Sequence, residues 1–227
     1  MNEVVFLVDV DNTLLDNDRI REDIQRDFEA RYGAESRDRY WAIQESLFVE
    51  LEYRDYLGAL QLYRKEHPGD MRVLSMASYL IDYPFGDRVY PGALATLARL
   101  RERGVAVILT DGDVVYQPHK VQRAGLAQAV GGNVLVYVHK EAAVADIERQ
   151  YPARHYVVID DKLRILDAIK RIWAERVTTV FVRQGAFAHD AAALASLEPA
   201  DVSVQQIADL LSYDLAALLT PVRQPFR

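Results

Sequence analysis

The sequence predicts an α/β protein built on a doubly wound parallel β-sheet that carries a helical insert. Short apolar runs rich in β-branched residues alternate with segments of helical periodicity, which is the pattern of strand–helix–strand units in a parallel sheet. Residues 17–88 interrupt this alternation, because they are helical in character and poor in strands. Four predicted strands are followed at once by polar residues that can take part in chemistry. Parallel strands place their carboxyl ends at one crevice, so these residues are predicted to meet there.

The composition bounds the class of protein. With 227 residues, 50% of them hydrophobic and 27% charged, the chain can form one large domain or one domain with an insert. The net charge of −7 argues against nucleic acid or an acidic membrane surface as the main partner, because both require a basic footprint. The chain has no cysteine, which excludes disulfides and thiol nucleophiles. It shows no signal peptide and no apolar run that could cross a bilayer, so we expect a cytoplasmic protein.

The first strand is predicted at residues 4–8, an apolar run typical of a strand buried on both faces. In the insert, Asp16 or Asn17 can cap a first helix that ends at Gly33. Two further helical regions are predicted at residues 36–67 and 71–81. We assign the remaining parts of the chain, 1–16 and 89–227, to the sheet domain and 17–88 to the helical insert.

The chain from residue 90 onward alternates between predicted helices and strands. The strands are expected at 105–109, 134–138, 156–159 and 177–182. The helices are expected at 91–104, 118–125, 141–150 and 163–173. A C-terminal helix is expected over 207–219, stopped by Pro221.

Acidic residues follow two of these strands. Asp9 and Asp11 come directly after the first strand, and Asp160 and Asp161 follow the strand at 156–159. Carboxylates held close together repel one another unless a cation or a proton lies between them. Carboxylate oxygens are the hard ligands that suit Mg²⁺. The sequence therefore predicts a divalent metal site, an acid/base pair, or both.

Two other strand ends supply groups that bind phosphoryl oxygens. Thr110 offers a hydroxyl at the end of the strand at 105–109, and Lys140 offers a positive charge after the strand at 134–138. Phosphoryl transfer depends mainly on positioning and on cancelling oxygen charge, which a metal and a lysine can supply. A carboxylate in such a site can act as the nucleophile and form an aspartyl-phosphate.

In this order the motifs resemble those of the haloacid dehalogenase (HAD) superfamily. Residues 9–13 read as its first motif, DxDxT after a strand. The later motifs are matched by Thr110, Lys140 and the pair Asp160–Asp161. The resemblance implies a Rossmann-like HAD core over 1–16 and 89–211, and a helical cap at 17–88.

The resemblance also implies a role for each residue. Asp9 would be the nucleophile and a Mg²⁺ ligand. Asp11 would be the general acid/base, with its backbone carbonyl on the metal. Thr110 would hold the phosphoryl group together with backbone amides near Asp111 and Gly112. An acid at the position of Asp11 favours phosphate chemistry over dehalogenation.

The remaining matched residues would complete the site. Lys140 would neutralise the nucleophile and the phosphate, with Lys120 as a rival for this role. Asp160 would ligate Mg²⁺, and Asp161 would be either a ligand through water or a residue that orients the site. The alternative for Asp161 is a cap of the helix after its strand. The chain departs from the family pattern at Ile165, where a further acid is often found, and at Asp111, where Asn is common.

These observations together predict a Mg²⁺-dependent phosphohydrolase that acts on a small phosphorylated metabolite. A phosphotransferase or phosphomutase would use the same residues and pass the phosphoryl group to a sugar. A receiver-like signalling domain also clusters acids, a threonine and a lysine, but the helical insert and the spacing of Asp9 and Asp11 argue against it. A protein that only binds a phosphorylated ligand is a further alternative, because of Asp111 and Ile165.

Overall fold

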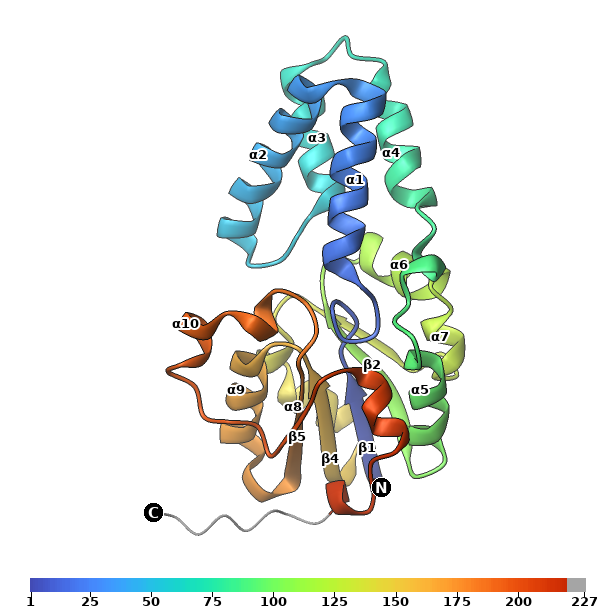
Figure 1. Cartoon of the computed structure of the whole chain (residues 1–227), viewed down its shortest axis with the longest axis vertical. Helices are drawn as coiled ribbons and strands as arrows, with labels where there is room; N and C mark the ends of the chain where they lie inside the picture. The colour runs from blue at the N-terminus through green and yellow to red at the C-terminus, as the bar shows by residue number, and fades with distance from the viewer. Residues whose placement is uncertain (220–227) are drawn as a thin grey trace.

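The computed structural model, which describes residues 1–219, contains a six-stranded sheet in which every strand is parallel to its neighbours (Figure 1). The strands lie in the order β3-β2-β1-β4-β5-β6. Their bounds are β1 Asn2–Val8, β2 Val105–Asp111, β3 Val134–Tyr137, β4 Ala153–Asp160, β5 Val177–Val182 and β6 Val202–Val204. This is the doubly wound α/β fold that the sequence predicts. β1 lies between β2 and β4, so the loops that follow these three strands meet at the switch point of the sheet.

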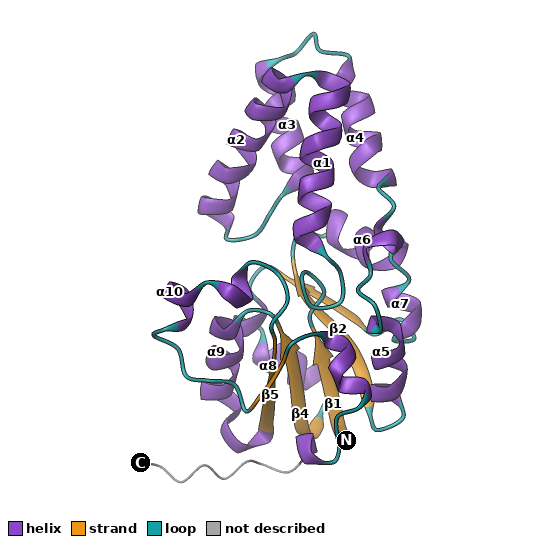
Figure 2. Cartoon of the chain, viewed as in Figure 1, coloured by secondary structure: helices purple, strands orange, loops and turns teal. Residues whose placement is uncertain are grey.

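Helices cover both faces of the sheet because side chains alternate along the buried strands (Figure 2). In β1, Phe6 and Val8 belong to one apolar core, and Val5 and Leu7 belong to the other. The helices packed on the Phe6 side are α5 (Ala93–Arg101), α6 (Tyr116–Arg123) and α7 (Leu126–Ala129). Those packed on the opposite side are α8 (Val144–Gln150) and α9 (Leu163–Trp173). A short helix, α10 (Ala191–Leu194), lies between β5 and β6 in the chain.

Four helices form a separate layer beyond the carboxyl ends of the strands (Figure 1). They are α1 (Asn17–Tyr32), α2 (Ala34–Leu51), α3 (Tyr56–Glu66) and α4 (Arg72–Asp82), and we call them the helical layer. Asp16 caps α1 by accepting the Arg19 N–H at 3.0 Å, as predicted. The layer has an aromatic core, in which the rings of Phe28 and Tyr40 lie 5.0 Å apart. The Tyr56 ring, 4.9 Å from that of Tyr116 on α6, joins this layer to the sheet.

The chain crosses between the two layers twice, and the two crossings lie side by side. The Asp16 N–H donates to the Arg88 carbonyl at 2.8 Å, and the Tyr90 N–H donates to the Leu14 carbonyl at 2.9 Å. These backbone hydrogen bonds fix the start of the helical layer beside its end. The two segments therefore form a two-stranded connection between the sheet domain and the helical layer, with Leu15 and Val89 as an antiparallel pair.

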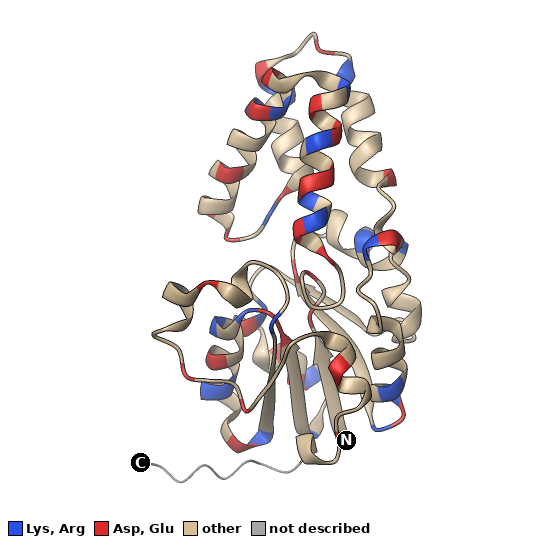
Figure 3. Ribbon diagram, in the orientation of Figure 1, with Lys and Arg blue, Asp and Glu red and all other residues tan. Residues whose placement is uncertain are grey.

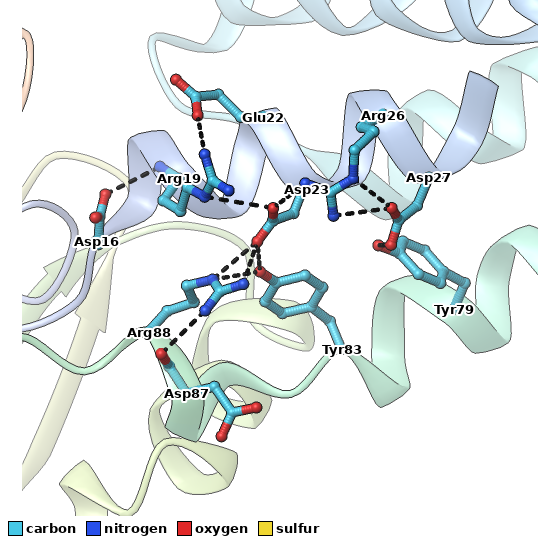
Figure 4. Close-up of polar contacts among 10 residues, drawn as sticks. All are labelled: Asp16, Arg19, Glu22, Asp23, Arg26, Asp27, Tyr79, Tyr83, Asp87 and Arg88. Atoms are coloured by element: carbon cyan, nitrogen blue, oxygen red, sulfur yellow. Dashed lines mark hydrogen bonds and ion pairs between the residues drawn. The ribbon is translucent and has the colours of Figure 1, made fainter. Parts of the chain in front are cut away.

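A charged network reinforces this connection (Figure 4). Asp23, buried on α1, accepts hydrogen bonds from the Tyr83 hydroxyl at 2.6 Å and from Arg88 Nε at 2.8 Å. Arg26 Nη1 donates to the same carboxylate at 2.6 Å. One buried acid thus ties α1 to the segment in which the chain returns to the sheet.

Two predicted helices differ from the observed elements. The region expected at 36–67 is two helices, because Glu52 adopts φ 59° and Asp55 begins α3 by accepting the Gly58 N–H at 2.6 Å. The C-terminal helix predicted at 207–219 is wrong. The chain there forms two short 3₁₀ turns, Ile207–Leu211 and Ala217–Leu219, and Pro221 lies outside the described residues.

The edge strand β6 is not among the strands predicted from the sequence. Its three residues are too few for a period to be recognised, and long-range contacts hold it in place. Asp201, just before β6, accepts the Thr179 N–H at 2.8 Å and pairs with Lys170 at 2.8 Å.

Acidic and basic residues are interspersed along α1 and also occur on other helices and loops of both layers (Figure 3). Among residues 1–219, no helix is both long and apolar enough to cross a membrane.

Candidate active site

Three buried carboxylates converge at the carboxyl ends of β1 and β4. Asp9, Asp160 and Asp161 each offer an oxygen, and these oxygens lie within 4.8 Å of one another. Both Asp161 oxygens are buried without a hydrogen-bond partner among the described residues. A buried carboxylate left unpaired in this way is costly unless a cation or a proton compensates it. The donor set is therefore the kind that holds a hard divalent cation.

Lys140 is the ammonium group of this cluster. Its Nζ lies 2.5 Å from Asp9 Oδ1 and 2.6 Å from Asp160 Oδ2. Burial alone would lower the pKa of Lys140, but the Asp160 and Asp9 carboxylates raise it well above its usual range. Lys140 is therefore held in its charged form between the two acids.

The ammonium groups of Lys140 and Lys162 both act on the three acids, and together they still leave an excess of negative charge. Burial and the Asp160 carboxylate raise the pKa of Asp9 to about 6, although Lys140 acts in the opposite direction. Burial and the same neighbouring carboxylates raise the pKa of Asp161 well above its usual range. An added divalent cation would correct this shortage of positive charge.

Both oxygens of Asp9 are held in place. Oδ1 contacts Lys140, and Oδ2 accepts a hydrogen bond from the Thr13 hydroxyl at 3.1 Å. Asn12 between them adopts φ 63°, a conformation that asparagine tolerates well. The turn after β1 thus aims the carboxylate of Asp9 at the cluster and leaves Asp11 to face elsewhere.

Asp11 has its own lysine. Lys120 Nζ lies 2.6 Å from Asp11 Oδ1 and 2.9 Å from Oδ2, and Gln117 Nε2 donates to Oδ2 at 3.3 Å. Gln117 and Lys120 are three residues apart on α6 and so share a face of the helix. The two lysines that the sequence presents as rivals therefore both reach the site, each beside a different aspartate. The Asp11 side chain is not part of the three-carboxylate cluster.

The residues after β2 take different positions. Thr110 is buried, and its hydroxyl accepts a hydrogen bond from Gln117 Nε2 at 2.8 Å. Asp111 accepts the backbone N–H of Lys140 at 2.8 Å, and burial raises the pKa of this carboxyl. The Gly112 N–H donates to the Tyr137 carbonyl at 2.9 Å, which extends the pairing of β2 with β3. Asp111 and the Gly112 amide are thus engaged in positioning the loop that carries Lys140.

The position of Ile165 explains one departure from the family pattern. Its side chain is fully buried in the apolar core on the α9 side of the sheet. It cannot approach a polar site, and Asp161 is the third carboxylate of the cluster instead.

A cavity of about 140 Å³ lies between the sheet and the helical layer. On the sheet side it is lined by residues that include Asp11, Lys120 and Lys162. On the side of the helical layer it is lined by residues that include Arg21, Arg54 and Tyr56. We call it the interlayer cavity.

Sequence reasoning missed several of these residues. Gln117, Arg21 and Arg54 belong to no recognisable motif, and Tyr56 reads as a core tyrosine. The ring of Tyr56 is indeed packed in the aromatic core, while the residue also lines the cavity. Only the spacing of Gln117 and Lys120, on one helix face after a motif strand, could have indicated a shared role.

Comparisons with known proteins identify the family of the chain. The model of the haloacid dehalogenase-like hydrolase family matches residues 4–172. The solved structure of a haloacid dehalogenase-like hydrolase from Burkholderia xenovorans LB400 is 54% identical, with a TM-score of 0.90, and the match covers 94% of this chain and 100% of that one. No curated protein was found that matches the chain.

Two more distant structures share the fold. A HAD hydrolase from Bacillus subtilis bound to magnesium is 14% identical, with a TM-score of 0.61, and the match covers 93% of this chain and 98% of that one. The L-2-haloacid dehalogenase from Xanthobacter autotrophicus with chloropropionic acid covalently bound is 17% identical, with a TM-score of 0.59 and coverage of 92% and 97%.

Proposed function

We propose that this chain, which belongs to the haloacid dehalogenase-like hydrolase family, is a Mg²⁺-dependent phosphohydrolase of small phosphorylated metabolites. The observation that carries the proposal is the placement of Asp9. It lies in a buried cluster with two further carboxylates and Lys140, while Asp11 faces the interlayer cavity beside it. In this arrangement Asp9 would be the nucleophile, the three carboxylates would form the cation site, and Asp11 would be the second acid.

The three carboxylates fit a divalent metal ion. Asp9, Asp160 and Asp161 would hold it, because their oxygens converge and those of Asp161 have no other partner in the described structure. When bound, Mg²⁺ would supply positive charge against the phosphoryl oxygens. The distant relative from Bacillus subtilis that was solved with magnesium is consistent with this choice of ion.

The residues of this chain would carry the reaction in two steps. Asp9 attacks phosphorus and the bond to the leaving oxygen breaks, while Asp11, which must enter this step protonated, gives that oxygen its proton. Water then attacks the aspartyl-phosphate, its proton passes to Asp11, and phosphate leaves with Asp9 restored. Lys140 lies against the attacking carboxylate, where it would offset charge on the phosphoryl group.

Other groups would orient the reactants. Lys120 and Gln117 hold the Asp11 carboxylate at the edge of the cavity. The helical layer covers the same edge of the sheet and would exclude water from it when a substrate is bound (Figure 1).

The test is hydrolysis of an aryl phosphate with Mg²⁺. We expect Asp9→Asn to lower kcat by about 10³-fold or more, because the nucleophile is lost. Asp167→Asn is the matched control, since Asp167 is also largely buried but pairs with Arg171 on α9, away from the site. Activity that persists in EDTA and in Asp9→Asn would overturn the proposal. Product analysis with an added acceptor sugar distinguishes hydrolysis from phosphotransfer.

A further inference from the structure

Two arginines and a tyrosine of the helical layer line the interlayer cavity. Arg21 comes from α1, Arg54 from the turn after α2, and Tyr56 from the first turn of α3. None of them belongs to the carboxylate cluster, and the proposed chemical steps use none of them. They line the cavity together with Asp11, but they come from the helical layer and Asp11 comes from the sheet domain.

These groups carry more positive charge than their partner neutralises. Arg54 lies 2.9 Å from Glu45, and Arg21 lies 3.5 Å from the same carboxylate oxygen. One glutamate, with 54% of its side chain exposed, therefore serves two arginines. The acids of the cavity edge are engaged elsewhere: Asp11 pairs with Lys120, and Asp18 accepts the Ala186 N–H at 2.7 Å. Glu52 also lines the cavity but is exposed.

Two hydrogen-bond donors of these residues lack partners. The Arg21 Nε and the Tyr56 hydroxyl are buried without a hydrogen-bond partner among residues 1–219. Tyr56 is only 3% exposed, and burial raises the pKa of its hydroxyl above its usual range, so it remains a neutral donor. Buried donors without partners are costly, and a ligand that accepts their hydrogen bonds would remove that cost.

Arg54 is also fixed in orientation. Its guanidinium lies 4.6 Å from the centroid of the Phe48 ring and makes a two-point contact with Glu45. The contact with Glu45 uses the Nη1/Nη2 fork, so the fork formed by Nε and the second Nη2 hydrogen remains to bind a further planar, two-oxygen acceptor. That geometry matches a carboxylate.

We infer that the substrate carries a carboxylate at the end opposite its phosphoryl group, and that Arg21, Arg54 and Tyr56 bind this carboxylate. The inference rests on the proposed function, which places the phosphoryl group at Asp9. It adds the substrate class, namely short phosphomonoesters of hydroxy acids, since the cavity of about 140 Å³ favours a compact ligand.

The test compares ligands that differ only at the tail. Binding of 2-carboxyethyl phosphate and of propyl phosphate is measured by calorimetry with Mg²⁺ on the Asp9→Asn protein, which does not turn them over. We expect the carboxylate ligand to bind at least about tenfold more tightly, as a charge-assisted pair of hydrogen bonds predicts. Equal affinities would overturn the inference. Tighter binding of ethane-1,2-diyl bisphosphate than of the carboxylate ligand would overturn the assignment to a carboxylate.

Variants connect this preference to the named residues. The quantity compared is the ratio of the affinity for 2-carboxyethyl phosphate to the affinity for propyl phosphate. Arg54→Gln and Arg21→Gln should each lower this ratio to about threefold or less, because one charged donor is lost. Tyr56→Phe should lower it about threefold without affecting folding, since it removes an oxygen that has no partner in the described structure. Arg37→Gln is the control: Arg37 has 26% of its side chain exposed against 28% for Arg21, but it pairs with Asp38 and does not line the cavity. A ratio unchanged in all three test variants would contradict the inference.

Turnover by the wild-type enzyme separates this inference from the proposed function. A tail preference in binding without hydrolysis of either ligand would reject the phosphohydrolase and retain the carboxylate site. Hydrolysis of both ligands with equal kcat/KM and equal affinity would retain the phosphohydrolase and reject the carboxylate site.

Discussion

At the scale of single residues, the site is defined by which lysine meets which acid. Lys140 lies between Asp9 and Asp160, and Lys120 holds Asp11. Each lysine is almost fully buried, and a buried ammonium group destabilises the protein unless a carboxylate pairs with it. This division separates Asp9, the proposed nucleophile and metal ligand, from Asp11, which is oriented at the cavity edge by Lys120.

The position of Lys140 leads to a prediction about stability. Replacing it by methionine in Lys140→Met would leave three buried carboxylates without their ammonium partner. We expect this change to lower the free energy of unfolding by roughly 3 kcal/mol in EDTA. Urea denaturation measures it, and Lys65→Met, at an exposed lysine, is the control. Wild-type stability in Lys140→Met would show that the acids are compensated in another way.

At the scale of elements, the connection between the layers depends on one acid of α1. Asp23 accepts hydrogen bonds from Tyr83 and from Arg88, which precede the return of the chain to the sheet (Figure 4). Burial alone would raise the pKa of Asp23, but the hydrogen bonds from Tyr83, Arg88 and Arg26 lower it to about 2. The ionised carboxylate is thus the form that stabilises this connection.

The lowered pKa of Asp23 fixes the pH range of its effect. A carboxyl whose folded pKa lies below its unfolded value of 3.8 stabilises the protein above pH 4, and this contribution is lost as the pH falls toward 2. We expect Asp23→Asn to lower the free energy of unfolding by roughly 2 kcal/mol at pH 6, and the difference from wild type to shrink between pH 4 and pH 2.5. Urea denaturation across this range measures it, with the exposed Asp38→Asn as control. A difference that is independent of pH would reject the ionised role of Asp23.

At the scale of the whole molecule, metal binding and folding should be coupled through the cluster. A ligand that binds only the folded protein stabilises it by about 2.7 kcal/mol at a concentration of one hundred times Kd. Because the carboxylate cluster forms only in the folded protein, we expect Mg²⁺ to raise the melting temperature of the wild type. Asp161→Asn should remove most of this increase, yet be at least as stable as wild type in EDTA, because it deletes an uncompensated buried carboxylate.

Calorimetric melting with and without Mg²⁺ tests this coupling. Asp167→Asn, outside the cluster, should keep the full response to Mg²⁺. A stabilisation by Mg²⁺ that is equal in Asp161→Asn and wild type would place the metal elsewhere.

The sequence by itself determined the fold class and the residues gathered at the edge of the sheet. Apolar runs such as residues 4–8 identify strands locally, and parallel strands bring their carboxyl ends together, so Asp9, Thr110 and Asp160 could be predicted to meet. The short strand β6 and the 3₁₀ turns after it could not be predicted, because contacts from distant residues such as Thr179 decide them rather than local periodicity.

Only the tertiary structure decided how these residues are paired. Asp111 lies beside the phosphate-binding motif in sequence, yet it accepts the Lys140 backbone N–H, because the β2 and β3 register brings their following loops together. Arg21 and Arg54 are 33 positions apart and share Glu45 only because α1 and α2 pack against each other. Strand identity follows from local pattern, whereas the partner of a charged side chain follows from packing over long sequence distances, which no local pattern encodes.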